Sequence, residues 1–124
     1  MNRRAIHPSD TTYAQAHEVS GATRIVFVSG QVPEAEDGTV PADFRSQCRL
    51  AWANVEIQLK AAGMTFDNLA KTTIFLADRR YREEAREVRQ ELLGDLAVQP
   101  AMTVVITGIY EEAWLLEIEA IAVA

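Results

Sequence analysis

The chain has 124 residues, a length typical of one domain, and we expect residues 1–124 to form a single unit. Its formal net charge of -6 disfavours a nucleic-acid partner, because phosphate recognition needs a basic surface. No apolar run is long enough to span a bilayer and no secretory signal pattern is present, so we expect a cytoplasmic protein without a membrane partner. The single cysteine, Cys48, excludes an internal disulfide and a cysteine-rich metal site.

The beginning of the chain predicts strands joined by turns. Residues 1–20 are polar with short apolar islands, a pattern that fits one or two edge strands. Arg24–Ser29 is a compact apolar segment, so we predict a strand that ends at Gly30. Residues 33–41 contain turn-forming residues and are predicted to form a loop.

The strongest helix pattern begins at Pro41. Apolar residues recur beyond it at steps of four or three and form one stripe: Phe44, Cys48, Ala51, Val55, Leu59 and Ala62. Asp43 is predicted to lie in the first turn, where the helix dipole favours a negative charge. Gly63 is predicted to end the helix, because glycine adopts the left-handed conformation at little cost. Since Cys48 lies on the apolar stripe, we interpret it as a core residue rather than a nucleophile.

The rest of the chain predicts three strands and one more helix. Lys71–Leu76 is rich in β-branched residues and is predicted to be a strand. Arg79–Leu93 is predicted to be a highly charged helix that stops near Gly94. Its apolar positions step by four, three and four: Tyr81, Ala85, Val88 and Leu92. Met102–Thr107 and Trp114–Ala124 are the last two predicted strands.

This order of elements predicts an α+β fold with two layers. Two helices would cover one face of a mixed sheet, and the core would lie between the layers. The other face of such a sheet would carry valine, isoleucine and phenylalanine, which must be buried in some way. We therefore expect a homo-oligomer that covers this open face.

The C-terminal strand carries the main candidate for chemistry. Alternation places one set of residues on one face of the strand, namely Leu116, Ile118, Ala120 and Ala122. Glu117 and Glu119 lie on the other face with Ile121 and Val123. A carboxylate on a half-buried strand near a cleft is a candidate acid or base, whereas a carboxylate that faces water is ordinary. Alternation alone leaves both interpretations of Glu117 open.

Several motifs in a consistent order resemble those of the Rid family, the reactive intermediate deaminases also known as YjgF or L-PSP proteins. The matching segments resemble the family's Tyr-Ser-Gln-Ala, Ser-Gly-Gln-Ile/Val-Pro, Ala-Ala-Gly, Val-Lys-Thr-Thr-Val-Phe-Leu-Asp, Pro-Ala-Arg-Ser and Glu-Ile-Glu-Ala-Ile/Val-Ala motifs. In this chain they are Tyr13–Ala16, Val28–Pro33, Ala61–Gly63, Leu69–Asp78, Pro100–Ala101 and Glu117–Ala122. Together they span almost the full length of the chain.

The resemblance implies a chorismate-mutase-like α+β domain. In this family three copies pack their sheets into a central barrel with the helices outside, and ligand clefts lie between neighbouring subunits. The resemblance also implies cofactor-independent, metal-free hydrolysis of reactive enamines and imines, such as 2-aminoacrylate and its imine tautomer, to a 2-keto acid and ammonia. The implied partners are therefore two further copies of the chain and a small metabolite.

The same resemblance assigns expected roles to residues of the cleft. Glu117 would orient the attacking water and move protons as the catalytic residue. Tyr13 would line the cleft with its hydroxyl end, Ser29 would lie beside the backbone N–H of Gly30, and the backbone of Val104 would donate a hydrogen bond to a substrate carboxylate. The implied substrate-binding set is Tyr13, Ser29, Gly30, Met102, Thr103 and Val104.

The chain departs from the family pattern at Met102. Deaminases of the family have an arginine at this place, which holds the substrate carboxylate through charge-assisted hydrogen bonds of about 1.5–3 kcal/mol each. The family's asparagine on the second helix is also missing, and Arg86 lies near its place with Arg89 one turn further on. These arginines are either a displaced carboxylate anchor or part of a solvated helix face.

Three interpretations of function follow from this pattern. The first is a hydrolase of small enamines or imines that lacks the usual carboxylate grip and belongs to a divergent branch of the family. The second is a non-catalytic trimer that binds a small metabolite or acts as a chaperone. The third is a ribonuclease, an activity attached to the family name, which the acidic composition argues against.

Overall fold

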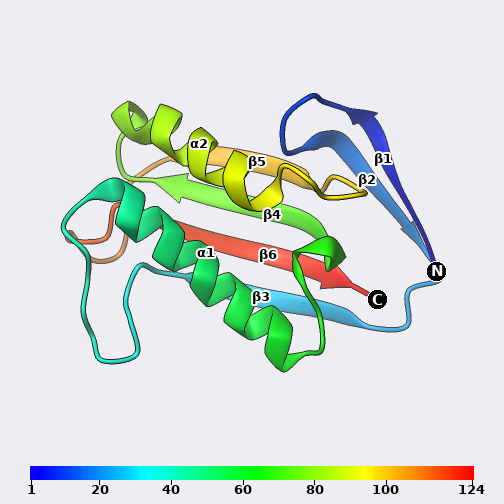
Figure 1. Cartoon of the computed structure of the whole chain (residues 1–124), viewed down its shortest axis with the longest axis horizontal. Helices are drawn as coiled ribbons and strands as arrows, with labels where there is room; N and C mark the ends of the chain where they lie inside the picture. The colour runs from blue at the N-terminus through cyan, green and yellow to red at the C-terminus, as the bar shows by residue number, and fades with distance from the viewer.

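The computed structural model describes all residues from 1 to 124 and shows two layers, a six-stranded mixed sheet and two α-helices on one of its faces (Figure 1). The strands are β1 (Asn2–Pro8), β2 (Ala14–Ser20), β3 (Ile25–Gln31), β4 (Leu69–Leu76), β5 (Ala101–Ile106) and β6 (Leu116–Val123). The helices are α1 (Phe44–Ala61) and α2 (Arg82–Leu93), with short 3-10 turns at Phe66–Asn68 and Arg79–Tyr81. The predicted α+β class is confirmed.

The strand order is β1-β2-β5-β4-β6-β3. β6 lies antiparallel between β3 and β4, and β4 runs parallel to β5. Parallel neighbours need a crossover connection, and α2 provides it. The β1–β2 hairpin joins the rest of the sheet through one parallel pair, Ala14 with Ala101, so most of one edge of β5 stays unpaired.

The first helix begins three residues later than Pro41. Asp43 is its N-cap rather than a first-turn residue, because its carboxylate accepts a hydrogen bond of 2.9 Å from the backbone N–H of Ser46. Gly63 follows the end of the helix with a φ of 72°, the left-handed conformation that was predicted for it.

The second predicted helix is divided in two. Asp78 caps the 3-10 turn Arg79–Tyr81, and α2 starts only at Arg82. Near its end, Leu93 is buried and Leu92 is exposed, so the expected core position was wrong by one residue.

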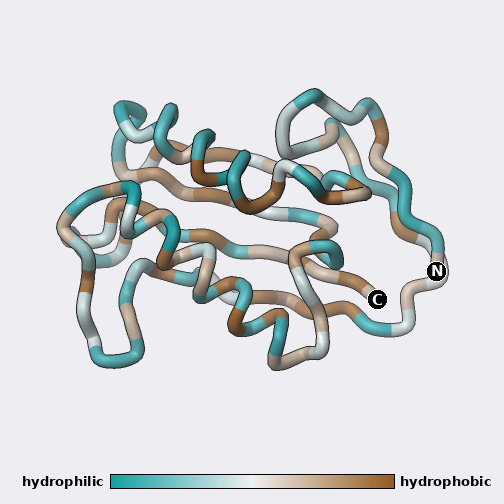
Figure 2. Tube along the Cα trace, in the orientation of Figure 1, coloured by the Kyte–Doolittle hydropathy of each residue, from teal (hydrophilic) through white to brown (hydrophobic).

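The core lies between the helices and the sheet. The apolar stripe of α1 packs there against alternate residues of β4 and β6, together with Val28 of β3. Figure 2 shows hydrophobic residues along the central strands and alternating polarity along the helices. No helix combines the length and the apolar content that a membrane span requires.

The opposite face of the sheet is uncovered. Ile25, Phe27 and Val105 are exposed on it, and 74% of the Phe27 surface is accessible. An apolar face of this kind has no internal partner in the chain.

Candidate functional site

The expected site residues form two groups on opposite faces of the sheet. Val104 is the register neighbour of Ile74, which is buried under the helices, so Val104 and Met102 face α2. Glu117 lies between the buried residues Leu116 and Ile118 of β6, so it faces the open side. The expected site residues of one chain therefore lie in two separate places, which we call half-sites.

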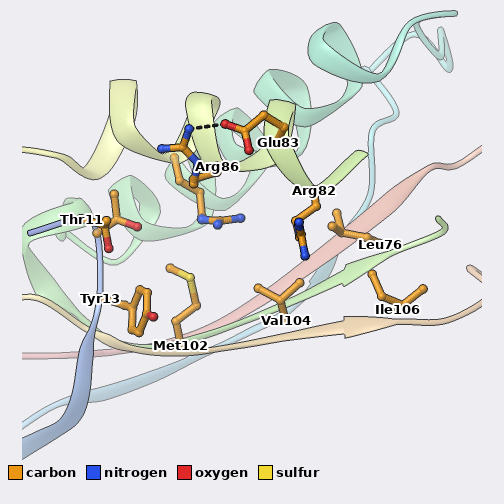
Figure 3. A pocket seen from close by; sticks show the side chains of 11 residues that line it. Thr11, Tyr13, Leu76, Arg82, Glu83, Arg86, Met102, Val104 and Ile106 are labelled. Carbon is orange, nitrogen blue, oxygen red and sulfur yellow. Dashed lines mark hydrogen bonds and ion pairs between the residues drawn. The ribbon is translucent and has the colours of Figure 1, made fainter. Parts of the chain in front are cut away.

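The first half-site is a pocket of about 630 Å³ between α2, β5 and the loop that joins β1 to β2, which we call the α2 pocket (Figure 3). Met102, Val104 and Ile106 extend from β5 toward α2, and Tyr13 lies at one end of the pocket. The remaining lining residues are Thr11, Thr12, Leu76, Arg82, Glu83, Arg86 and Arg89.

Gln99 fixes the loop that brings Tyr13 to this pocket. Its side-chain amide donates to the carbonyls of Ser9 (2.9 Å) and Thr11 (3.1 Å), and its side-chain oxygen accepts from the Ser9 N–H (3.0 Å). The backbone N–H of Ala14 donates to the carbonyl of Pro100 at 3.0 Å. These bonds tie the loop to the start of β5, and thereby hold Tyr13 near Met102.

The backbone of Val104 has a free donor at the edge of β5. The N–H of Thr107 donates to Leu76 of β4, and N–H groups alternate between the two edges of a strand. The N–H of Val104 therefore points away from β4, where β2 pairs with β5 only at Ala101. This geometry leaves the Val104 N–H available to a ligand, as the expected role requires.

The second half-site is formed by Ser29, Gly30 and Glu117, and we call it the Glu117 half-site. A β-bulge shapes it, since Ser29 and Gly30 together lie opposite the single residue Glu119 between the Val28–Ala120 and Gln31–Ile118 pairs. The strand therefore continues through Gly30 to Gln31 instead of ending at Gly30.

The Glu117 carboxylate lies directly against the backbone of Gly30. A Cβ on residue 30 would collide with the carboxyl oxygen, so glycine is required for this close approach. Glu117 is half-buried and makes no hydrogen bond or ion pair with the chain, whereas Glu119 is exposed. Of the two candidate carboxylates, Glu117 is thus the one that lies in a shaped environment.

Thr103 lies apart from its two neighbours on β5. Its side chain is on the open face, where its hydroxyl accepts a hydrogen bond of 2.7 Å from the ammonium of Lys71. The structure therefore does not bring the Thr103 side chain into the α2 pocket with Met102 and Val104.

The charged face of α2 differs from the expectation of a wholly solvated surface. Arg86 is exposed and paired with Glu83, as expected. Arg89 is only 9% exposed, and desolvation lowers the pKa of its guanidinium. Arg89 lies four residues after Ala85 and directly after Val88, at the edge of the apolar stripe of α2. This position was the one feature of the sequence that indicated its burial.

Cys48 lies on the buried face of α1, in the core, as predicted. Burial raises the pKa of its thiol to about 12. Such a thiol stays protonated at neutral pH and is a poor nucleophile.

The family model described as Endoribonuclease L-PSP matches residues 4–124. The chain belongs to this family, the Rid proteins. The RutC family protein YjgH of Escherichia coli K12 is 40% identical over 100 residues, which cover 76% of each chain. TdcF of the same organism, provisionally named a reactive intermediate deaminase, is 35% identical over 101 residues, which cover 80% of this chain and 78% of TdcF.

Solved Rid structures share the fold. YyfB from Yersinia pestis has a TM-score of 0.86 over the full length of both chains, and at 20% identity this likeness concerns the fold alone. The crystal structure of E. coli TdcF with bound serine has a TM-score of 0.76 at 32% identity and covers 98% of this chain and 94% of that one. The chain is thus similar to a Rid protein that binds a small amino acid.

Proposed function

We propose that this Rid protein is a cofactor-independent hydrolase that releases ammonia from small reactive enamines or imines. The observation that carries the proposal is the unpaired Glu117 carboxylate, which is half-buried against Gly30. The relation to TdcF supports the same chemistry.

The complete site would form between copies of the chain. Glu117 and the α2 pocket lie on opposite faces of one sheet, so a second copy is needed to bring such half-sites together. The exposed side chains of the open face and the unpaired edge of β5 give an apolar surface for this contact. We propose a homotrimer in which three sheets close into a barrel with three equivalent clefts.

The proposed reaction needs only water and a proton carrier. Glu117 would accept a proton from water as the oxygen attacks the carbon of the C=N bond, and would return it to the nitrogen. The hydroxyl proton of the resulting carbinolamine then passes through Glu117 to the nitrogen, and the C–N bond breaks to give a carbonyl product and ammonia; an enamine substrate first tautomerises to the imine. Tyr13 and the N–H of Val104 would hold the substrate, and Ser29 would line the side nearest to Glu117.

A release assay tests this proposal directly. We expect the native chain to liberate ammonia from freshly generated 2-aminoacrylate, and Glu117→Gln to lower the rate by about 10²- to 10⁴-fold, because it removes the proton acceptor. Glu119→Gln is the matched control, since Glu119 is exposed on the same face of the same strand. Full activity in Glu117→Gln would contradict the assigned role.

A non-catalytic trimer that binds a small metabolite, or acts as a chaperone, is the alternative that Met102 favours. If the native chain releases no ammonia but a metabolite raises its melting temperature, the binding function is supported and hydrolysis is refuted.

A further inference from the structure

Arg89 is the one charged residue among the buried positions of α2. The other buried residues of this helix are Ala85, Val88 and Leu93, which are apolar. Transfer of a guanidinium into such surroundings is costly unless a partner compensates for the lost water. A guanidinium in the position of Arg89 is therefore expected to have a hydrogen-bond acceptor or an anion beside it.

The chain itself offers no such partner. Arg89 makes no hydrogen bond or ion pair with any residue, and its Nε is buried without an acceptor. The groups whose charges act on its pKa are a thiol and a phenol, those of Cys48 and Tyr13, and another arginine, Arg86, but no carboxylate. By contrast, Arg45 and Arg49 of α1 pair with glutamates of α2, and Arg86 pairs with Glu83.

The surroundings of Arg89 are those of an anion site. Three arginines and one glutamate line the α2 pocket, and that glutamate, Glu83, is already paired with Arg86. This excess of positive charge occurs in a chain whose net charge is -6. The hydroxyl groups of Thr11, Thr12 and Tyr13 line the same pocket and supply neutral donors.

We propose that Arg89 is the anion anchor of the α2 pocket and that the ligand of this protein carries a carboxylate. A guanidinium forms two parallel hydrogen bonds with a carboxylate, a geometry that a thioether such as Met102 cannot supply. The anchor thus comes from α2, across the pocket from β5. The inference deepens the proposed function by naming its substrate class, and the anion site itself exists even if no hydrolysis occurs.

Equilibrium binding separates the anchor from the chemistry. Pyruvate, a stable 2-keto acid, is titrated into the native chain by calorimetry, with its uncharged amide and inorganic phosphate as comparison probes. We expect saturable binding of pyruvate, at least tenfold weaker binding of the amide, and weaker binding of phosphate. Equal binding of pyruvate and the amide would overturn the proposal, and tighter binding of phosphate would overturn the carboxylate assignment.

Two matched variants locate the anchor. We expect Arg89→Met to weaken pyruvate binding by about 10- to 100-fold, the loss of one or two charge-assisted bonds. Arg49→Met should change it by less than about threefold, because Arg49 lies outside the α2 pocket and its guanidinium is paired with Glu91. The reverse order of the two effects, or unchanged binding in Arg89→Met, would overturn the assignment.

A double variant and a conservative substitution distinguish loss of the anchor from loss of the fold. Arg89→Met combined with Met102→Arg moves the guanidinium across the pocket, and we expect it to recover binding relative to Arg89→Met alone. If Arg89→Met does not fold, Arg89→Lys takes its place and should weaken binding, because it keeps the charge but loses the paired hydrogen bonds. In Glu117→Gln, intact pyruvate binding without ammonia release supports both the anchor and the proposed chemistry. Ammonia release at the native rate in this variant would refute only the catalytic role of Glu117, and loss of pyruvate binding in Arg89→Met would still be expected.

Discussion

At the scale of single residues, the surroundings of Glu117 distinguish it from Glu119. Its carboxylate is half-buried against Gly30, in a place that a side chain at that position would fill. Glu119 lies two residues further on the same face and is exposed to water. Two identical side chains on one strand thus have different surroundings, because Gly30 of the neighbouring strand lies against the carboxylate of Glu117 and not against that of Glu119.

Gly30→Ala tests this contact. The added Cβ would push the Glu117 carboxylate from its place, so we expect at least a tenfold loss of ammonia release and a stability loss of about 1–3 kcal/mol. Enzyme assays and urea denaturation measure the two effects. Gly108→Ala is the control, since a Cβ there meets no atom within 4 Å, and it should be neutral. Equal behaviour of the two variants would rule out the close approach.

At the scale of elements, caps and crossovers set where the helices lie. Asp43 caps α1 at the end near the start of β6, where the Gln47 side chain bonds to Ala113 and Leu115, and Asp78 caps the 3-10 turn before α2. Two ion pairs, Arg45 with Glu87 and Arg49 with Glu91, join the two helices at the surface. α2 connects the parallel strands β4 and β5, and its buried side carries Arg89. Arg89 therefore lines the α2 pocket together with Met102 of β5.

The cap of α1 gives a prediction about pH. Hydrogen bonds from Ser46 lower the pKa of Asp43 below its ordinary value. A carboxyl group whose folded pKa is depressed stabilises the fold above its unfolded pKa, and this contribution is lost as the pH falls through the folded pKa. Asp43→Ala should therefore lower the urea midpoint more at pH 7 than at pH 3. An equal difference at both values would contradict a charged cap.

Much of the fold could be predicted from the sequence, because periodicity and turn residues act locally. Local patterns predicted the apolar stripe of α1, its end at Gly63 and the alternation of β6. The bulge at Ser29 and Gly30 was not, since it depends on register with β6. The burial of Arg89 was also missed. Its place beside Val88 put it at the edge of the apolar stripe, but only the packing of α2 against the sheet decides how far that edge is covered.

At the scale of the whole molecule, the open face of the sheet is an apolar surface that no other part of the chain covers. Phe27 is the most exposed of its large apolar side chains, and β5 has an unpaired edge beside the α2 pocket. Assembly through this surface would be stabilised by about 25 cal/mol of free energy for each Å² of apolar surface that it buries. The same contact would join the two half-sites, so assembly and activity should be lost together.

Phe27→Glu tests this link. A charge on the open face should prevent burial against a second copy, so we expect light scattering to show a single-chain mass and the ammonia assay to show loss of activity. Ile57→Glu is the control, because Ile57 is exposed on α1, in the other layer. A native chain with the mass of a monomer would refute the shared cleft, as would a fully active monomeric variant.

The sequence by itself determined the two-layer fold, the family and the candidate carboxylate, because local periodicity and motif order are properties of the chain alone. Only the tertiary structure decided that Glu117 and the α2 pocket lie on opposite faces of the sheet, and that Arg89 is buried without a partner. Both facts depend on strand register and on which helix side meets the sheet. Those relations are fixed by contacts between residues that lie far apart in the sequence.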